Sequence, residues 1–410
     1  MSERIVIKEI CEVYDGPHAT PKKTVDGPVY LGIDAITDDG KINAKEFAHL
    51  SEEDYIKWTK RVTPQYGDIV FSYEATLGRY ALIPKDFYGC LGRRLAIIRN
   101  VSKDIDTLWL YYYFLSPEWK QFIQSKIIKG STVNRISVED FPTYTVPNIS
   151  IKVQRKIANI LSKIDEKIAL NNNINDNLEQ QAKLIYDYWF TQFDFPDKNG
   201  KPYCSSGGKM VWNEQLKRNI PENWNVIPLL KLVSWESNSQ PPKSEFVYEP
   251  KEGYVRFIQN RDYDSDTHIT YIPRTKNLSI VDRFDILMDK YGDAGAVRYG
   301  IEGAFNVALG KICVHNPNYR EYIRSFLGSD GIYKFLHNSC MASTRASLSE
   351  ANLEILNVVV PDEKIILDYE NFLHKIRVSI LKNKDETVEL INLRDWLLPM
   401  LMNGQATISD

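Results

Sequence analysis

The amino-acid sequence of 410 residues contains the same series of features twice, once in each half. In order along the chain, the matched features are Val29–Ile36 with Val255–Asp262, Asp68–Val70 with Asp285–Leu287, Ser131-Thr132 with Ser343-Thr344, Ser137–Phe141 with Ser349–Leu353, and Pro147 with Pro361. The members of each pair are separated by about 212–226 residues. Because self-similarity at a fixed period is typical of repeat architectures, the sequence predicts one structural plan used twice.

A long segment with heptad spacing follows each copy of this series. In the first half the apolar positions are Val153, Ile157, Ile160, Ile164, Ile174, Leu178, Ile185 and Tyr188, with polar gaps at Lys167, Asn171 and Gln181. In the second half the pattern runs through Tyr369, Phe372, Ile376, Ile380, Asn383, Thr387, Leu390, Leu393, Leu397 and Leu401. Each segment of about 40 residues would form a helix of about 60 Å. We expect the two to pair as an antiparallel coiled coil in which asparagines fix the register. The alternative is two separate helices that each pack on their own domain.

The predicted fold class is therefore α+β with an internal pseudo-twofold repeat. Two similar mixed α/β domains occupy residues 1–150 and 200–360, and the long helices occupy residues 151–199 and 361–410. Residues Thr107–Ile127 read as an aromatic-rich helix. Its aromatic side chains, Tyr111, Tyr112, Tyr113 and Trp119, occur at helical spacing, which favours core packing over stacking on bases.

Composition limits the choice of partners. The net charge is −3, and residues 1–150 carry 19 basic against 20 acidic side chains. Because this lacks the basic excess of a nonspecific DNA coat, any DNA contact must use local patches or partner proteins. No apolar run is long enough to span a membrane, and the N-terminus does not resemble a signal peptide, so we expect a cytoplasmic protein without membrane contact. The five scattered cysteines read as reduced thiols.

Enzyme motifs fail on spacing or residue type. Asn316-Pro317-Asn318-Tyr319 lacks the second proline of the adenine methyltransferase motif, and no glycine-rich cofactor turn precedes it. Gly303–Lys311 has the wrong glycine spacing for a phosphate-binding loop, and Ile312 cannot supply a hydroxyl to magnesium. The histidines form no metal-ligand pair. We predict a chain that is not an enzyme, with no catalytic residue, metal or cofactor of its own.

Two kinds of loop in each half are candidates for DNA contact. In the first half the candidate residues are Ser72, Tyr73, Thr76 and Arg79 in a glycine-bearing loop, the neighbours Arg93 and Arg94, and Lys129, Ser131, Thr132, Asn134 and Arg135 in a polar loop. In the second half they are Lys290, Tyr291, Arg298, Ser343, Thr344 and Arg345. Hydroxyl groups and lysine can hold phosphates, while arginine and asparagine can pair with guanine and adenine edges. The alternative is solvated turns with incidental charge.

The chain resembles the specificity subunits of type I restriction-modification systems along nearly its whole length. The most distinctive matches are Val153–Phe195 and Gly208–Trp224, which look like the family's central helical region and the entry to its second recognition domain. Cys11–Pro21 and Leu393–Gln405 are similar to the family's opening and closing segments. One departure is Ala342-Ser343, where the family's polar loop usually begins with Gly-Ser, as at Gly130-Ser131.

The resemblance implies two target recognition domains, each of which reads one half of a split sequence in double-stranded DNA. It also implies helices that set the gap between the half-sites, and assembly with two modification subunits that methylate adenine. Those subunits would carry S-adenosylmethionine. Restriction subunits that translocate DNA with ATP and Mg would be optional partners.

Two other functions stay open at this point. The first is a protein–protein scaffold without direct DNA recognition, which the absent basic excess favours. The second is a degenerate methyltransferase, which binding of S-adenosylmethionine by the isolated chain would reveal.

Overall fold

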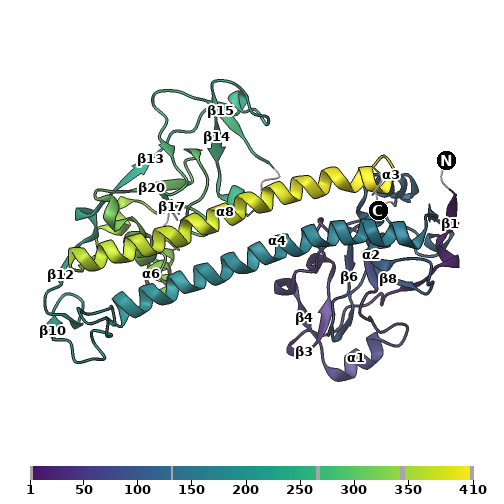
Figure 1. Cartoon of the computed structure of the whole chain (residues 1–410), viewed down its shortest axis with the longest axis horizontal. Helices are drawn as coiled ribbons and strands as arrows, with labels where there is room; N and C mark the ends of the chain where they lie inside the picture. Colours follow the sequence, from purple (N-terminus) through teal and green to yellow (C-terminus); the bar gives the residue numbers. More distant parts are fainter. Residues whose placement is uncertain (1–2, 131–132, 265–267, 342–346, 407–410) are drawn as a thin grey trace. The chain divides into compact units, whose positions relative to one another are not determined.

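The computed structural model describes residues 3–130, 133–264, 268–341 and 347–406, in a mixed α/β fold with two long helices (Figure 1). The chain divides into two compact units. Unit 1 comprises residues 1–170 and 387–410, and unit 2 comprises residues 171–386.

Unit 1 contains two sheets and a strand pair. Its strands are β1 (Arg4–Val6), β2 (Cys11–Asp15), β3 (Thr24–Leu31), β4 (Ala48–His49), β5 (Ile69–Ser72), β6 (Tyr80–Leu82), β7 (Gly89–Leu91), β8 (Leu95–Asn100) and β9 (Thr145–Pro147). The antiparallel sheet has the order β2-β8-β5-β6, the smaller sheet has the order β4-β3-β7, and β1 pairs with β9. Strand β5 is buried throughout because alternate side chains enter different cores. Ile69 and Phe71 pack in the core that contains the helices, whereas Val70 packs against Leu31 and Leu91 of the smaller sheet.

The helices of unit 1 are α1 (Glu52–Trp58), α2 (Thr107–Leu115) and α3 (Pro117–Lys126). The single helix expected over residues 107–127 is thus two helices. The chain breaks at Ser116, whose hydroxyl caps α3 by accepting a hydrogen bond from Trp119 N, with Pro117 following as the first helical residue. The four aromatic residues assigned to the core are buried, which confirms that prediction. The indole of Trp119 donates to the hydroxyl of Tyr80 at 2.8 Å.

Unit 2 has sheets with the corresponding strand order. Its strands are β10 (Met210–Asn213), β11 (Arg218–Pro221), β12 (Asn225–Pro228), β13 (Val233–Ser237), β14 (Tyr254–Ile258), β15 (Tyr271–Pro273), β16 (Ile280–Val281), β17 (Ile286–Asp289), β18 (Val297–Arg298), β19 (Gly303–Phe305), β20 (Leu309–Val314) and β21 (Asn357–Val360). The first sheet, β13-β20-β17-β18, has the connectivity of β2-β8-β5-β6 in unit 1. Strands β14 and β19 pair in parallel, as β3 and β7 do. Strands β12 and β21 pair as β1 and β9 do, and β10 and β11 form an added hairpin.

The shorter helices of unit 2 are α5 (Arg320–Leu327), α6 (Asp330–Met341) and α7 (Glu350–Leu353). The Asn-Pro-Asn-Tyr segment, which lacks the second proline of a methyltransferase motif, forms a single 3-10 turn at Pro317–Tyr319, next to α5. The asparagine that precedes this turn, Asn316, accepts a hydrogen bond from Asn318 N and caps it.

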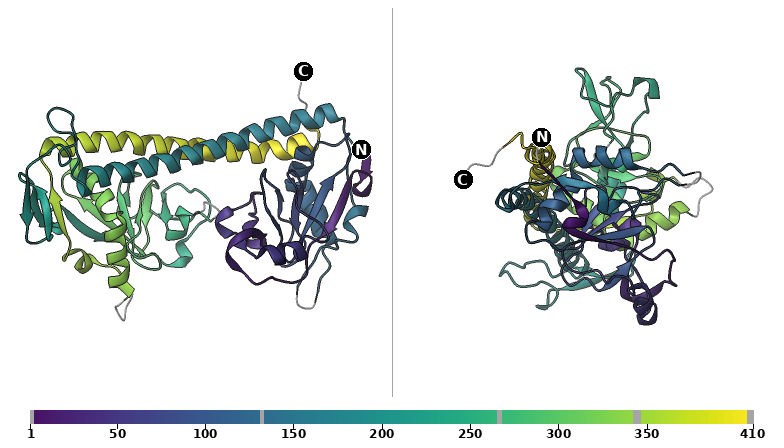
Figure 2. Two further views of the ribbon diagram at one scale, coloured as in Figure 1. Left: turned by 90° about the horizontal axis from the view of Figure 1, so that it is seen from below. Right: turned by 90° about the vertical axis from the view of Figure 1, so that its right-hand side faces the viewer.

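Two long helices, α4 (Ile151–Tyr186) and α8 (Glu363–Met402), each contribute residues to both units (Figures 1 and 2). Helix α4 ends in a π-helical turn at Asp187–Thr191. Within unit 1, Arg394 of α8 pairs with Asp165 of α4 at 3.0 Å. Within unit 2, three α4–α8 pairs follow one another, Asn171 with Glu386, Asn175 with Asn383 and Glu179 with Arg377. Because the residue numbers on α4 rise while those of their partners on α8 fall, the two helices run in opposite directions there.

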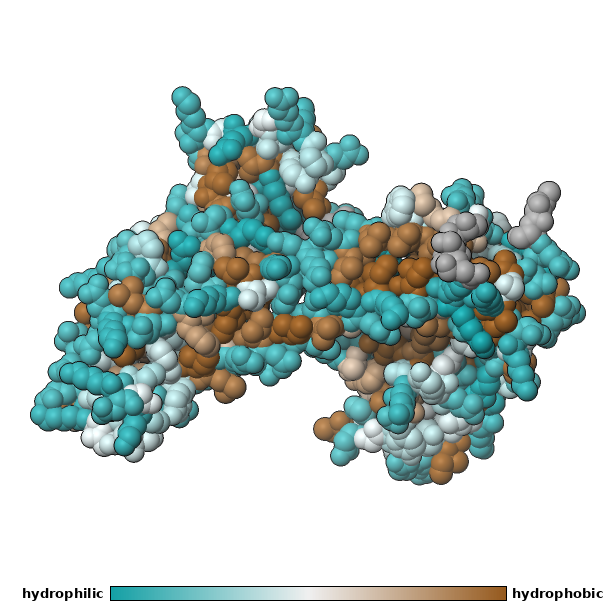
Figure 3. All heavy atoms as spheres, in the orientation of Figure 1, coloured by the Kyte–Doolittle hydropathy of each residue, from teal (hydrophilic) through white to brown (hydrophobic). Residues whose placement is uncertain are grey.

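The buried face of the long helices differs in part from the predicted stripe. On α4 the buried positions are Gln154, Ile157, Ala158, Leu161, Ile164, Ile168, Asn171, Asn175, Ala182 and Tyr186, and on α8 they include Ile366, Tyr369, Leu373, Ile376, Ile380 and Leu401. The prediction was wrong for five residues that are exposed, namely Val153, Ile174, Tyr188, Phe372 and Leu393. Exposed apolar side chains appear as brown patches among hydrophilic residues on the face drawn in Figure 3.

The physical reason is that polar residues with partners occupy the buried seam. Gln154, for example, is fully buried because its side chain accepts from Asp106 N and donates to the carbonyl oxygens of Asp104 and Ile149. A satisfied amide is tolerated where an unpaired one would cost free energy. An assignment that follows apolar residues alone therefore selects Val153 and Ile174, whereas the adjacent polar residues Gln154 and Asn175 are the buried ones.

Within the described ranges, no helix is long and apolar enough to cross a membrane. All five cysteines are free thiols, and three of them, Cys11, Cys90 and Cys340, are buried. The described residues also contain no group of three or more histidine, cysteine or acidic side chains arranged to hold a metal ion.

Candidate nucleic-acid interface

In unit 1 the glycine-bearing loop is a closed turn between β5 and β6. Ser72 N donates to the carbonyl oxygen of Arg79 at 3.0 Å, and Gly78 N donates to the carbonyl oxygen of Ser72 at 2.9 Å. The Ser72 hydroxyl is fully buried and accepts from Arg79 N at 3.0 Å. Gly78 has φ of +73°, a conformation that favours glycine. Ser72 thus holds the shape of this turn.

Two other predicted segments lie against this turn. Tyr73 N donates to the carbonyl oxygen of Arg94, and Ile136 N donates to the carbonyl oxygen of Tyr73 at 2.7 Å. Glu74 and Ile128 form bridges with Arg135. The structure therefore brings together the turn, the arginine pair and the polar loop.

The charged side chains of this site divide into paired and exposed groups. Arg79 contacts both carboxylate oxygens of Asp38, at 2.6 and 3.1 Å, and Arg94 pairs with Glu74 at 2.9 Å. By contrast, the exposed candidates are Arg93, Lys129, Asn134 and Arg135, and Thr76 is half-buried. The exposed cations can reach a phosphate or a base edge directly, whereas Arg79 and Arg94 would first exchange a carboxylate partner.

The polar loop needs a glycine at its start. A side chain on Gly130 would meet the carbonyl oxygen of Val133 at 2.3 Å, which is too close for a carbon atom. Ser131 and Thr132 lie outside the described residues.

Tyr73 is buried and faces inward. Burial and the neighbouring Asp15 carboxylate raise the pKa of its hydroxyl. Asp15 in turn lies 2.9 Å from His18 and 3.8 Å from Arg61, whose side chains are both largely exposed. Sequence reasoning missed these two side chains. The adjacent Lys60 and Arg61 were the available signal in the sequence for a basic site. Their position near Tyr73 could not be predicted, because it depends on how distant segments of the chain pack together.

Unit 2 repeats the hydrogen bonds of this site with different side chains. Asp289 N donates to the carbonyl oxygen of Ala296, and Gly295 N donates to that of Asp289, as Ser72 and Gly78 do in unit 1. Lys290 N donates to the carbonyl oxygen of Ala308 at 2.8 Å, and Leu348 N donates to that of Lys290 at 3.0 Å. Lys290 thus takes the backbone position that Tyr73 takes in unit 1.

A buried carboxylate distinguishes the site in unit 2. The Asp289 side chain is almost fully buried and pairs with Arg298 at 2.8 Å, and Arg298 also lies 3.4 Å from Asp293. Burial raises the pKa of Asp289, and the contact with Arg298 opposes that shift. Arg298 is therefore held in the turn, while Tyr291 is exposed and Lys290 is half-buried. Ser343, Thr344 and Arg345 lie outside the described residues.

Comparisons with known proteins agree on one class. Residues 2–180 match the family model described as the type I restriction modification DNA specificity domain. The chain is 23% identical to the type I restriction enzyme MjaIX specificity subunit of Methanocaldococcus jannaschii, over 88% of this chain and 82% of that protein. It is 21% identical to the HindI specificity subunit of Haemophilus influenzae, over 83% of this chain and 86% of that protein.

A solved structure has the same fold. The S subunit of a type I restriction-modification system from M. genitalium superposes with a TM-score of 0.59 at 15% identity, covering 99% of this chain and 96% of that one. The chain is thus similar in sequence to type I restriction-modification specificity subunits over most of its length and shares the fold of one of them. Residues 2–180 match the DNA specificity domain of these proteins, and the relatives named above are specificity subunits.

Proposed function

We propose that the chain is the DNA-reading, non-catalytic subunit of a type I restriction-modification complex. Residues 1–150 and 200–360 each read one half of a split DNA target, and residues 151–199 and 361–410 hold the two readers apart. The relatives, all specificity subunits of type I restriction enzymes, support this assignment.

The observation that carries the proposal is the hydrogen-bond scheme shared by the two loops. Tyr73 and Lys290 correspond, because each donates its backbone N–H to one neighbouring segment and accepts at its carbonyl oxygen from another. Arg79 and Ala296 also correspond, because the carbonyl oxygen of each accepts from the residue that begins the turn. An identical backbone that presents different side chains suits two readers of the same build and different sequence preference. We infer from this scheme and the matching strand order that the two units are copies related by an internal pseudo-twofold repeat.

The proposed contacts come from both loops of each half. In the first half they are Thr76, Arg79, Arg93, Arg94, Lys129, Ser131, Thr132, Asn134 and Arg135, and in the second they are Lys290, Tyr291, Arg298, Ser343, Thr344 and Arg345. Ser72 and Tyr73 are both buried, so their proposed role is to support the conformation of the first loop and not to contact DNA. The exposed cations supply the phosphate contacts that a chain of net charge −3 cannot supply through bulk charge.

The two long helices are proposed to form an antiparallel coiled coil. Buried positions recur in steps of three and four from Gln154 to Asn175 on α4 and from Ile366 to Ile380 on α8, which is the heptad spacing of such a seam. A rigid rod of this kind fixes the number of base pairs between two half-sites. Modification subunits with S-adenosylmethionine would then methylate adenine within the complex, and ATP- and Mg-dependent restriction subunits would be further partners.

The test is selection from a random pool of double-stranded DNA, using the chain co-purified with its modification subunits. We expect enrichment of one asymmetric, split motif with a constant gap. Affinity for that motif should fall steeply with salt concentration, because binding releases counterions from phosphates. A pool without any enriched motif, bound equally at low and high salt, would instead identify a protein–protein scaffold.

A further inference from the structure

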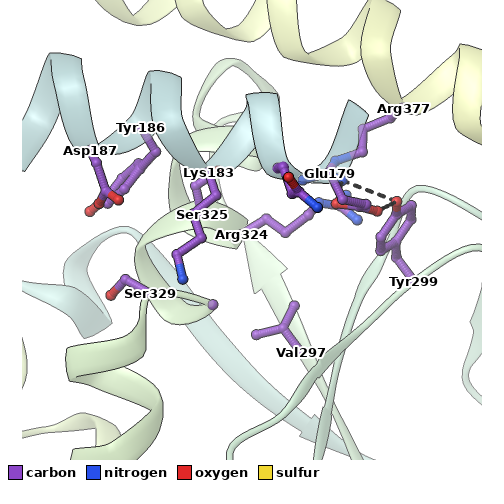
Figure 4. A pocket seen from close by; sticks show the side chains of 12 residues that line it. Glu179, Lys183, Tyr186, Asp187, Val297, Tyr299, Arg324, Ser325, Ser329 and Arg377 are labelled. Carbon is purple, nitrogen blue, oxygen red and sulfur yellow. Dashed lines mark hydrogen bonds and ion pairs between the residues drawn. The ribbon is translucent and has the colours of Figure 1, made fainter. Parts of the chain in front are cut away.

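Unit 2 contains a pocket of about 330 Å³ that the DNA-reading function does not use (Figure 4). Its walls come from α4, from β18 and the residue after it, from α5 and the turn that follows, and from α8. The lining includes Lys183, Val297, Tyr299, Arg324, Ser329 and Arg377. Figure 4 shows Lys183, Val297 and Ser329 around the open part of the pocket, and Arg324 and Arg377 at its inner end.

A buried network of charges forms this inner end. Arg377 Nε lies 3.0 Å from Glu321, and Arg377 Nη1 donates to the Tyr299 hydroxyl at 3.0 Å and pairs with Glu179. The Tyr299 hydroxyl in turn donates to Glu179. Glu321 is fully buried, and its second carboxylate oxygen lies 3.1 Å from Arg324. The carboxylates around Arg377 are thus already engaged.

Arg324 has unused hydrogen-bonding capacity. Its side chain is only 3% exposed, and Nη2 donates to the carbonyl oxygen of Phe284 at 2.5 Å in addition to its contact with Glu321. The guanidinium lies 4.6 Å from the centre of the Tyr299 ring. Within the part of the chain that the structure describes, no atom accepts a hydrogen bond from Nε or Nη1, which together carry three of the five N–H groups of an arginine. Both atoms are closed off from solvent, so a ligand reaches them when the adjoining side chains move aside. A buried donor without an acceptor costs about 1–3 kcal/mol.

The mouth of the pocket supplies a second cation and an apolar wall. Lys183 pairs with Asp330 at 2.8 Å, but both side chains are more than half exposed, so this pair is weak and exchangeable. Val297 and the Tyr186 and Tyr299 rings add apolar surface to the pocket lining, with Tyr186 and Tyr299 at opposite ends of the pocket in Figure 4. The volume is several times that of a lone oxyanion, so it also accommodates an organic body.

We propose that this pocket binds a small organic anion, in which a carboxylate or phosphate group on a short apolar body accepts hydrogen bonds from Arg324. Lys183 adds charge at the mouth. The carboxylates of Glu179, in the inner network, and of Asp187 also line the pocket and restrict it to ligands that carry one compact anionic group, because a second negative charge would be repelled.

The first test measures thermal unfolding and titration calorimetry of the full-length chain with sodium benzoate, sodium phosphate and benzyl alcohol, at ionic strength held constant with NaCl. We expect a saturable rise in Tm with benzoate or phosphate and none with benzyl alcohol. Arg324→Met and Lys183→Met should each weaken anion binding, the former by about tenfold or more. The matched control is Lys334→Met, because Lys334 is an exposed lysine of the same unit outside the pocket.

The second test does not depend on the folding of the Arg324 variant. Val297→Glu places a carboxylate in the pocket, and Val297→Gln is its uncharged counterpart. We expect the glutamate variant to have the higher Tm at pH 7 and to lose its response to benzoate. The proposal is overturned if neither benzoate nor phosphate acts differently from NaCl on the unmodified chain, or if Val297→Glu is less stable than Val297→Gln.

Discussion

The side-chain amide of Asn383 on α8 donates a hydrogen bond of 2.9 Å to the side-chain carbonyl oxygen of Asn175 on α4. Asn175 is buried, and its own amide points to the carbonyl oxygen of Ile380. One turn away, the buried Asn171 donates to Glu386 at 2.8 Å. Polar pairs in an apolar seam are satisfied in one alignment only, so they select the register at some cost in stability.

Replacement of one asparagine should therefore cost more than replacement of both. Asn383→Leu leaves the buried Asn175 carbonyl without its donor and should lower the free energy of unfolding by about 1–3 kcal/mol. The double variant Asn175→Leu/Asn383→Leu should recover most of that loss. Urea unfolding of the four proteins in the cycle measures the coupling, and strictly additive losses would contradict it.

Arg135 is an exposed cation at the point where the polar loop meets the turn after β5. Arg135→Ala should weaken binding of the preferred DNA target by about 1–3 kcal/mol and relax one position of the selected motif. Fluorescence anisotropy on the target and on its single-base variants measures both effects. Lys85→Ala, an exposed lysine outside the predicted loops, is the control. Equal weakening on every sequence would show that Arg135 contacts phosphate only.

The pair formed by Asp289 and Arg298 should be needed for the stability of unit 2. Arg298→Met would leave the buried Asp289 carboxylate unpaired and cost about 3 kcal/mol at neutral pH. Because burial already raises the pKa of Asp289, loss of the arginine should raise it further. Protonation then removes the unpaired charge, so the deficit of the variant should shrink as pH falls. A deficit that is the same at pH 5 and pH 8 would argue against this account.

Glu370 should make the chain less stable as pH rises. Burial raises the pKa of this carboxyl to about 7, although it accepts a hydrogen bond from Glu321 N at 2.8 Å. A folded-state pKa above the unfolded value of about 4.3 means that the folded state holds the proton more tightly. The contribution of Glu370 to stability is therefore lost between about pH 4.3 and 7 and stays constant above that.

The variant Glu370→Gln keeps an acceptor for Glu321 N without the titration. Relative to the unmodified chain it should gain about 1 kcal/mol between pH 5 and pH 8, a value reduced for partial solvent screening. Urea unfolding at four pH values measures this difference. A difference that does not change with pH would refute the role of Glu370.

The long helices should set the gap in the DNA target. Removal of seven residues from α4 and of seven facing residues from α8 preserves the heptad phase and shortens each helix by about 10 Å. That length corresponds to about three base pairs at 3.4 Å per base pair along one strand. We expect the selected motif to keep both half-sites and to have a shorter gap. A motif with the original gap would exclude the rod as the spacer.

The sequence predicted where helices and strands occur along the chain better than it predicted which face of each long helix is buried. The strands that contain Val29 and Val255, the loops after Asp68 and Asp285, and the two long helices lie where the repeat places them. These features depend on local apolar patterns, which are visible in a linear sequence. The break at Ser116 also had a local signal, a serine followed by proline, which the aromatic run on either side obscured.

The candidate loops were predictable as loops, but the state of their charges was not. Arg79 and Arg135 are both loop arginines in the sequence, yet the first contacts Asp38, 41 residues away, while the second is exposed. The ion pair of Arg79 and the position of His18 and Arg61 beside Tyr73 depend on how distant segments pack.

The sequence by itself predicted a mixed α/β fold with two long helices, because apolar periodicity and spacing act over neighbouring residues. Only the tertiary structure decided which face of each long helix is buried and which loop arginines form ion pairs with carboxylates. A buried polar side chain such as Asn175 is tolerated only where its partner, Asn383, arrives from 208 residues further along the chain. Hydrogen bonds and ion pairs of this kind depend on the distance between two groups in space, which cannot be deduced from their separation along the chain.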